Sequence, residues 1–189
     1  MTHVHGSDLD KPVGDRRSER RARMRQFQSQ LLDRMQVARE HRDVNISQLA
    51  VVIGNVNYLI KLHESGEIVS IGQLVKVPLT QEWYLGLLNI RGNLVGVVDF
   101  QRFQGQPALE ITQDSRVVGF SPTLGFNCGF LVSKVLGLRN VADMDLKELS
   151  STITDNWLGK NYIDGDNQRW VEVNLSNLVR NVGFLHIGL

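Results

Sequence analysis

Few residues of this sequence combine the types and the spacing that catalysis or metal binding needs. The nearest approach to a zinc site is His63-Glu64, but a zinc protease motif requires a second histidine at position 67, where Glu67 stands. Ser121 lacks the glycine that a nucleophile elbow carries two residues after its serine. The sequence also lacks a glycine-rich loop that would hold a phosphate. These patterns disfavour an enzyme and imply neither a metal nor a cofactor.

Two other motifs with chemical potential have structural interpretations. The single cysteine, Cys128, lies in Phe-Asn-Cys-Gly-Phe-Leu-Val, and this apolar setting predicts a small buried side chain rather than a reactive thiol. Residues 164–167, Asp-Gly-Asp-Asn, lack the spacing of a calcium-binding loop and fall between two predicted strands. We therefore expect a solvated hairpin tip at these residues.

The clearest candidate for partner binding is Arg91, which lies in a predicted β-hairpin over residues 83–100. Gly92-Asn93 separates two runs rich in Leu, Ile and Val, and it predicts a two-residue type II′ turn. In that register Arg91 lies opposite Leu94. An arginine at a hairpin tip can bind a carboxylate through two hydrogen bonds. A charged tip is also a routine aid to solubility, so contact with a partner is the stronger of two interpretations.

Strand alternation separates the charge of Arg91 from that of Asp99. Alternate residues of a strand face opposite sides of the sheet, so the predicted register places the two charges on different faces. Asp99 lies opposite Gly86 in this register, and we expect its carboxylate to accept backbone N–H groups where the strand ends. Arg91 is thus assigned to a partner and Asp99 to the fold.

The elements that must position this hairpin are mostly short strands. Turn residues punctuate strand-sized apolar segments, and many such segments in one domain predict barrels or a sandwich. Helix is scarce: Asn174 is a predicted N-cap for residues 175–180, and short turns are expected at residues 80–83 and 143–149. The predicted strands cover residues 49–53, 56–62, 67–71, 85–91, 94–100, 116–121, 127–138, 159–164 and 169–173.

The composition is that of an ordinary globular protein preceded by a basic extension. The chain has 189 residues and a formal net charge of +1, which gives no bulk attraction to nucleic acid. Residues 1–43 hold ten Lys or Arg against seven Asp or Glu, whereas the remainder holds eleven against thirteen. The sequence has neither an apolar signal segment nor eighteen consecutive apolar residues, which predicts a cytoplasmic protein without membrane insertion.

We expect an extension over residues 1–43 and a folded domain over residues 44–189. Residues 1–17 are polar and predict a disordered start, and a helix follows from Ser18 to about residue 42. The arginines of this helix could contact phosphates or form a solvated face, and its apolar stripe could dock on this or another protein. The stripe consists of Met24, Phe27, Leu31 and Met35, with Ala38 behind them.

The hairpin resembles the hallmark of CheW-like chemotaxis adaptor domains. The resemblance rests on Gly86-Leu-Leu-Asn-Ile-Arg-Gly, on the apolar strand that follows, and on Asp99. Upstream, Glu67-Ile68 resembles the family's acidic position in its third strand. Downstream, residues 116–119 and 130–138 resemble the first strands of the family's second half. The likeness covers about residues 46–181.

This resemblance implies a mostly β fold of two intertwined SH3-like five-stranded β-barrels, beside the N-terminal helical extension. It implies a non-enzymatic adaptor that joins the cytoplasmic tip of a methyl-accepting chemoreceptor to the regulatory domain of a CheA-type histidine kinase, at receptor arrays beneath the inner membrane. The Trp83-Tyr84 lead-in is most similar to the branch that serves type IV pili and twitching motility. No cofactor is implied.

Residue by residue, the resemblance implies a set of partner-binding positions, in which Asn89 and Gly92 also belong with Asp99 to the structural frame of the motif. The partner-binding set consists of Glu67, Gly86, Asn89, Arg91, Gly92, Asn93 and Val95.

One departure and one rival limit what the resemblance implies. The family usually has proline in the strand before the aspartate, whereas this chain has Gly96, which predicts a less rigid strand with exposed backbone. The rival is a nucleic-acid-binding small β-barrel that uses the basic extension. The three tryptophans are dispersed, so no strand offers the paired exposed aromatics that stack on bases, and we expect no nucleic-acid partner.

Overall fold

The computed structural model describes residues 47–147 and 156–189, all of which belong to one unit, Asp43–Leu189. The predicted N-terminal extension, with the apolar stripe Met24, Phe27, Leu31 and Met35, lies outside the described residues. Within the described part, none of the helices is long and apolar enough to span a membrane.

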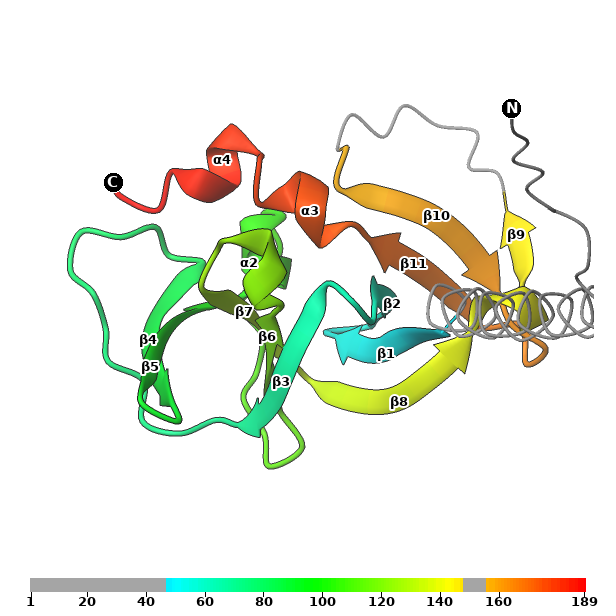
Figure 1. Ribbon diagram of the computed structural model, residues 1–189, viewed down its shortest axis with the longest axis horizontal. Helices are drawn as coiled ribbons and strands as arrows, with labels where there is room; N and C mark the ends of the chain where they lie inside the picture. The colour runs from blue at the N-terminus through cyan, green and yellow to red at the C-terminus, as the bar shows by residue number, and fades with distance from the viewer. Residues whose placement is uncertain (1–46, 148–155) are drawn as a thin grey trace, which may run out of the picture. The chain divides into compact units, whose positions relative to one another are not determined.

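A six-stranded sheet takes strands from both ends of this unit (Figure 1). Neighbouring strands in this sheet run antiparallel, except for β2 and β11, which run parallel. In spatial order the strands are β8 (Lys134–Asn140), β1 (Ser47–Ile53), β2 (Val56–Lys61), β11 (Arg169–Val173), β10 (Leu158–Ile163) and β9 (Asp145–Lys147).

A five-stranded sheet comes from the middle of the chain and curls on itself (Figure 1). Neighbouring strands in this sheet run antiparallel, except for β5 and β7, which run parallel. In spatial order its strands are β3 (Ser65–Ser70), β6 (Arg116–Phe120), β7 (Cys128–Val132), β5 (Asn93–Val98) and β4 (Tyr84–Ile90). The first and last strands of the described part therefore belong to one sheet, and the other sheet is built from strands between them; the predicted mostly β fold class is confirmed.

Within residues 47–147 and 156–189, the helices are single turns. They are α2 (Phe100–Phe103), α3 (Leu175–Leu178) and α4 (Val182–Leu185), accompanied by 3₁₀ turns at Pro122–Leu124 and Val141–Asp143. Asn174 caps α3 as predicted, because its side chain accepts the Asn177 N–H at 2.8 Å. The predicted turn at residues 164–167 is also confirmed as a hairpin tip between β10 and β11.

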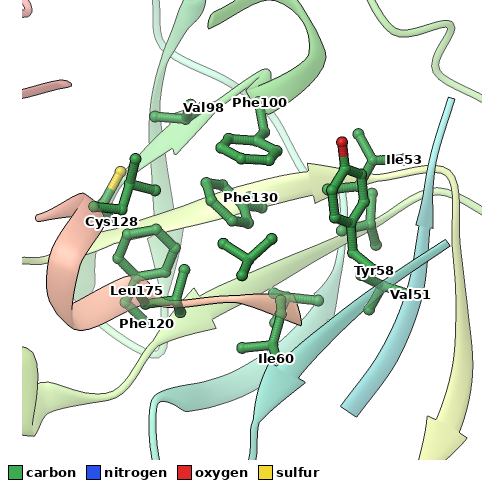
Figure 2. Close-up of a cluster of buried hydrophobic side chains, with 14 of the residues drawn as sticks. Val51, Ile53, Tyr58, Ile60, Val98, Phe100, Phe120, Cys128, Phe130 and Leu175 are labelled. Carbon is green, nitrogen blue, oxygen red and sulfur yellow. The ribbon is translucent and has the colours of Figure 1, made fainter. Parts of the chain in front are cut away.

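The largest core cluster contains residues of both sheets, and Figure 2 shows its centre. Phe100 and Phe130 have ring centroids 4.5 Å apart, and both side chains are fully buried. Val51 and Ile60 reach this cluster from β1 and β2, whereas Ala50 faces a separate cluster on the other side of the sheet. Side chains that alternate along these strands thus form two buried faces of the sheet.

Two predicted elements differ from the structure. Residues 127–138 were expected to form one strand, but β7 ends at Val132 and β8 begins at Lys134 in the other sheet. Ser133 makes the crossing, since its N–H donates to Val52 O at 2.8 Å and its Oγ accepts the Gly54 N–H at 3.1 Å. A turn was also expected at residues 143–149. The observed turn instead ends at Asp143, and Asp145–Lys147 form β9 because they pair with β10.

Candidate partner-binding site

The hairpin is present, but its predicted register is wrong. Ile90 pairs with Asn93 and Gly86 with Val97, so the two-residue turn is Arg91-Gly92 rather than Gly92-Asn93. Both turn residues have positive φ, 51° for Arg91 and 91° for Gly92, as a type I′ turn requires. Arg91 is therefore the first residue of the turn itself.

The side chain of Asn89 explains why the turn forms here. Its Oδ1 accepts the Gly92 N–H at 2.8 Å and so closes the turn from the strand side. Gly92 adopts positive φ without strain, whereas Arg91 occupies a left-handed conformation that costs a non-glycine residue about 1–2 kcal/mol. Asn89 and Gly92 thus hold Arg91 in an unfavourable backbone conformation at an exposed tip.

Arg91 and Glu67, which were expected separately to contact partners, lie together. Arg91 Nη1 is 3.2 Å from Glu67 Oε1, and the two side chains are 81% and 48% exposed. An ion pair this exposed contributes about 0–1 kcal/mol to the stability of the fold. Both charges therefore remain accessible at the protein surface.

An open groove of about 630 Å³ lies beside this ion pair. Three of the predicted residues, Glu67, Asn93 and Val95, line the groove. Val95 is buried and belongs to its floor, whereas Asn93 is exposed at the start of β5. The site therefore combines charges at its edge with an apolar interior.

Sequence reasoning missed the apolar lining of this groove. Ile90, Phe120 and Phe126 contribute to it from β4, from the end of β6 and from the loop before β7. These positions are far apart in the sequence and meet because β6 and β7 pair in the same sheet as β4 and β5. The two aromatics that bracket the Pro122–Leu124 turn are the only local signal that could have indicated them.

Gly86 is buried where the backbone of Val75 approaches β4. It is buried at φ 127°, and a Cβ built there would lie 2.3 Å from Val75 O. The absent side chain lets Val75 and Leu87 exchange two backbone hydrogen bonds of 2.9 and 2.8 Å. Gly86 is thus buried in this structure, and its contact with a partner stays a prediction.

Asp99 lies on a different element from Arg91 and is engaged internally. Its carboxylate is 1% exposed and caps α2, accepting the Arg102 N–H at 3.0 Å and the Leu109 N–H at 2.7 Å. The predicted pairing of Asp99 with Gly86 is wrong, because the Asp99 N–H donates to Trp83 O. Its bonds to backbone N–H groups are of the kind expected for a structural carboxylate.

Gly96 is not an exposed weak point in the strand. The residue is buried, and a Cβ built there would lie 2.8 Å from the hydroxyl oxygen of Tyr84. Its N–H donates to Asn127 O at 3.0 Å, a bond that proline could not make. The ring of Tyr84 thus takes the space of a side chain at position 96, which corrects the expectation of exposed backbone.

Cys128 lines the groove, whereas Glu64 and His63 lie outside its lining. Cys128 is buried as predicted, and this burial raises the pKa of its thiol to about 12. Glu64 accepts N–H groups from α3, whereas His63 is exposed. Among residues 47–147 and 156–189, no group of three or more His, Cys, Asp or Glu side chains is placed to hold a metal.

Comparisons with known proteins agree with this architecture. The family model described as CheW-like domain matches residues 48–183. The crystal structure of the scaffolding protein TtCheW from Thermoanaerobacter tengcongensis superposes with a TM-score of 0.61, covering 74% of this chain and 95% of that one at 20% sequence identity. A search of curated protein sequences found no match. The structural likeness shows a shared fold.

The two sheets, with the groove on the five-stranded one, define a mostly β domain. The matched region extends over most of the chain, from β1 to the start of α4. The chain belongs to the CheW-like domain family.

Proposed function

We propose that this chain is a non-enzymatic adaptor that couples a chemoreceptor to a CheA-type histidine kinase. Its CheW-like domain supports this function, and so does the fold that it shares with a scaffolding protein. The expected partners are the cytoplasmic tip of a methyl-accepting receptor and the regulatory domain of the kinase. The expected location is the cytoplasm, at receptor arrays.

The observation that carries the proposal is the Arg91–Glu67 pair beside an apolar groove. An exposed ion pair is held weakly in water, so either charge can exchange its partner for one on another protein at little cost. Once water is excluded, a guanidinium bound to a carboxylate becomes stronger and directional. The groove beside it supplies apolar area, which drives association.

A finer proposal concerns the branch of the family. We assign the chain to the PilI type, which serves type IV pili and twitching motility, on the basis of the Trp83-Tyr84 lead-in. In the structure Trp83 stacks on Phe184 with centroids 5.7 Å apart, and Tyr84 covers Gly96. These aromatics support the positions of β4 and α4, so the likeness concerns the framework behind the hairpin.

The test is a charge reversal at the tip in the full-length chain. Arg91→Glu should reduce co-purification with a CheA-type kinase and a receptor fragment at least tenfold and leave the melting temperature unchanged. Arg180→Glu is the matched control, because Arg180 is also exposed and forms no salt bridge with Glu67 or any other described carboxylate. Assembly that survives Arg91→Glu would show that the tip assignment is wrong.

A charge swap separates partner binding from a purely structural function of the pair. The double variant Arg91→Glu/Glu67→Arg keeps an ion pair but inverts the charges beside the groove. We expect its melting temperature to match the wild type and its assembly with kinase and receptor to stay impaired. Restored assembly would mean that the pair acts only inside the fold.

A further inference from the structure

The six-stranded sheet carries a second hollow, which is larger and chemically unlike the groove beside Arg91. Its volume is about 860 Å³, and it is formed by β2, β9, β10, β11 and the hairpin turns next to them. It shares no lining residue with the first groove. The polar residues used in this argument are Asn57, Lys147, Asn161, Asn167, Gln168 and Arg169.

We infer that this hollow is a second docking surface, built for an extended acidic segment of a protein partner. The inference extends the proposed function, since an adaptor that couples two proteins needs two surfaces that do not overlap. It assigns to the second surface a chemistry different from that of the apolar groove.

The hollow has two positively charged side chains in its lining. Lys147 and Arg169 are the charged residues that line the hollow, and both side chains are exposed. Within the described part of the chain, neither forms a salt bridge. They stand on β9 and β11, separated by β10, which corresponds to about 10 Å between strand axes. Two carboxylates along one extended segment can meet both cations.

Among the described residues, no Asp or Glu side chain lines the hollow. Asp164 accepts the Trp170 Nε1–H at 2.8 Å and two backbone N–H groups of its own turn. Asp145 lies two residues before Lys147 on β9, and so on the same face, but it is not among the lining residues. Its negative charge repels an acidic segment. Removing that charge should therefore change the affinity in the opposite direction from removing Lys147 or Arg169.

The amides of the lining favour a polypeptide. Asn57 Nδ2 donates to Gln168 Oε1 at 3.3 Å, which leaves an acceptor on Asn57 and donors on Gln168 directed to no other described group. Amide side chains of this kind match the donors and acceptors of a peptide backbone. Tyr162 is the lining aromatic and is 8% exposed, so the hollow offers no platform for stacking bases.

The apolar residues complete the surface. Val56 is 41% exposed, and Ile163 and Val171 are half-buried beside it. They offer area that a partner can cover, while the cations and amides set its orientation. A segment of alternating acidic and small residues satisfies all three features.

The test measures fluorescence anisotropy of a labelled ten-residue peptide of alternating Glu and Ser with the full-length chain. Wild-type protein should bind it saturably and bind the matching Lys and Ser peptide at least tenfold more weakly. Lys147→Glu/Arg169→Glu should weaken binding more than tenfold, and Asp145→Asn should tighten it. Lys160→Glu is the charge-matched control, since Lys160 is exposed on β10 outside the lining, and it should cause less than a twofold change.

Three outcomes would overturn the inference: absence of binding by the wild type, equal binding by Lys147→Glu/Arg169→Glu and wild type, or tighter binding of a ten-nucleotide oligothymidylate than of the acidic peptide. Melting temperatures within about 2 °C of the wild type would show that the variants are folded. Arg91→Glu should leave peptide binding unchanged. Failure of the peptide assay and failure of the Arg91→Glu assembly assay are therefore separate results.

Discussion

Arg91 Nη1 lies 3.2 Å from Glu67 Oε1, and this contact joins the two edges of the five-stranded sheet. Glu67 belongs to the edge strand β3, and Arg91 directly follows the opposite edge strand β4. Because the sheet curls on itself (Figure 1), the side chain of Arg91 reaches Glu67, which lines the groove. The pair thus closes the sheet with side chains that stay available to a partner.

Arg91→Asn should separate stability from binding. Asparagine tolerates the left-handed conformation that Arg91 adopts at φ 51°, and Asn-Gly is a favoured type I′ turn. We expect the free energy of unfolding to rise by about 0.5–1 kcal/mol, since the relief of backbone strain exceeds the loss of an exposed ion pair. Urea denaturation measures the gain, and co-purification with kinase and receptor measures the loss of assembly. A lower stability would mean that the turn is not strained at Arg91.

Gly96 and Tyr84 should behave as a coupled pair. A Cβ at position 96 would lie 2.8 Å from the Tyr84 hydroxyl oxygen and 2.9 Å from a ring carbon. Gly96→Ala should therefore cost about 1–3 kcal/mol through overpacking. Tyr84→Leu removes the ring, so the double variant should be more stable than the sum of the two single changes predicts. Additive effects in urea denaturation would contradict the contact.

The sequence predicted the fold class and most strands, because alternation and turn residues are local signals. It predicted the wrong hairpin register because Gly92 can serve as the first or the second residue of a two-residue turn. The choice depends on the Asn89 side chain, which accepts the Gly92 N–H and fixes Arg91 at positive φ. A single hydrogen bond thus decided a register that composition left open.

The candidate site was predictable in its charges and not in its apolar interior. Arg91 and Glu67 belong to motifs that the resemblance marks, whereas Phe120 and Phe126 meet Ile90 through strand pairing between distant segments. The break at Ser133 is likewise tertiary, because its hydrogen bonds reach Val52 and Gly54. Features that depend on long-range pairing leave little trace in local sequence.

Cys128 should make stability fall at high pH. Burial raises the pKa of its thiol from 9.0 to about 12, so above pH 9 the unfolded chain loses this proton while the folded chain keeps it. The folded state then binds more protons, and its stability decreases by at most about 1.4 kcal/mol per pH unit from this group. Urea denaturation at pH 8, 9 and 10 should show a shallower decline for Cys128→Ala than for the wild type. Identical slopes would contradict the raised pKa.

Native Cys128 should also resist thiol reagents. The side chain is 2% exposed and protonated at neutral pH, and the thiolate is the reactive form. At pH 8 we expect modification by a disulfide reagent to be at least a hundredfold slower in buffer than in 6 M guanidinium chloride. Rapid modification of the folded chain would show that the thiol is accessible through the groove.

We expect substitution of the Glu64 carboxylate to lower the stability of the described domain strongly. Its side chain is 2% exposed and accepts the Leu175 N–H at 3.0 Å, the Ser176 N–H at 3.3 Å and the Ser176 hydroxyl at 2.5 Å. The backbone oxygen of Glu64 accepts the Ser121 N–H at 2.8 Å, so this residue links the turn before β3 to α3 and to the end of β6.

Glu64→Gln replaces an acceptor by an amide donor facing those N–H groups and should lower the free energy of unfolding by about 2–3 kcal/mol. Ser176→Ala removes one of the three bonds and should cost about 1 kcal/mol. Glu67→Gln is the control, because its half-exposed side chain forms only the surface ion pair and should change stability by less than about 1 kcal/mol. Urea denaturation of the three variants measures these differences, and equal stabilities for Glu64→Gln and Glu67→Gln would show that α3 does not depend on the buried carboxylate.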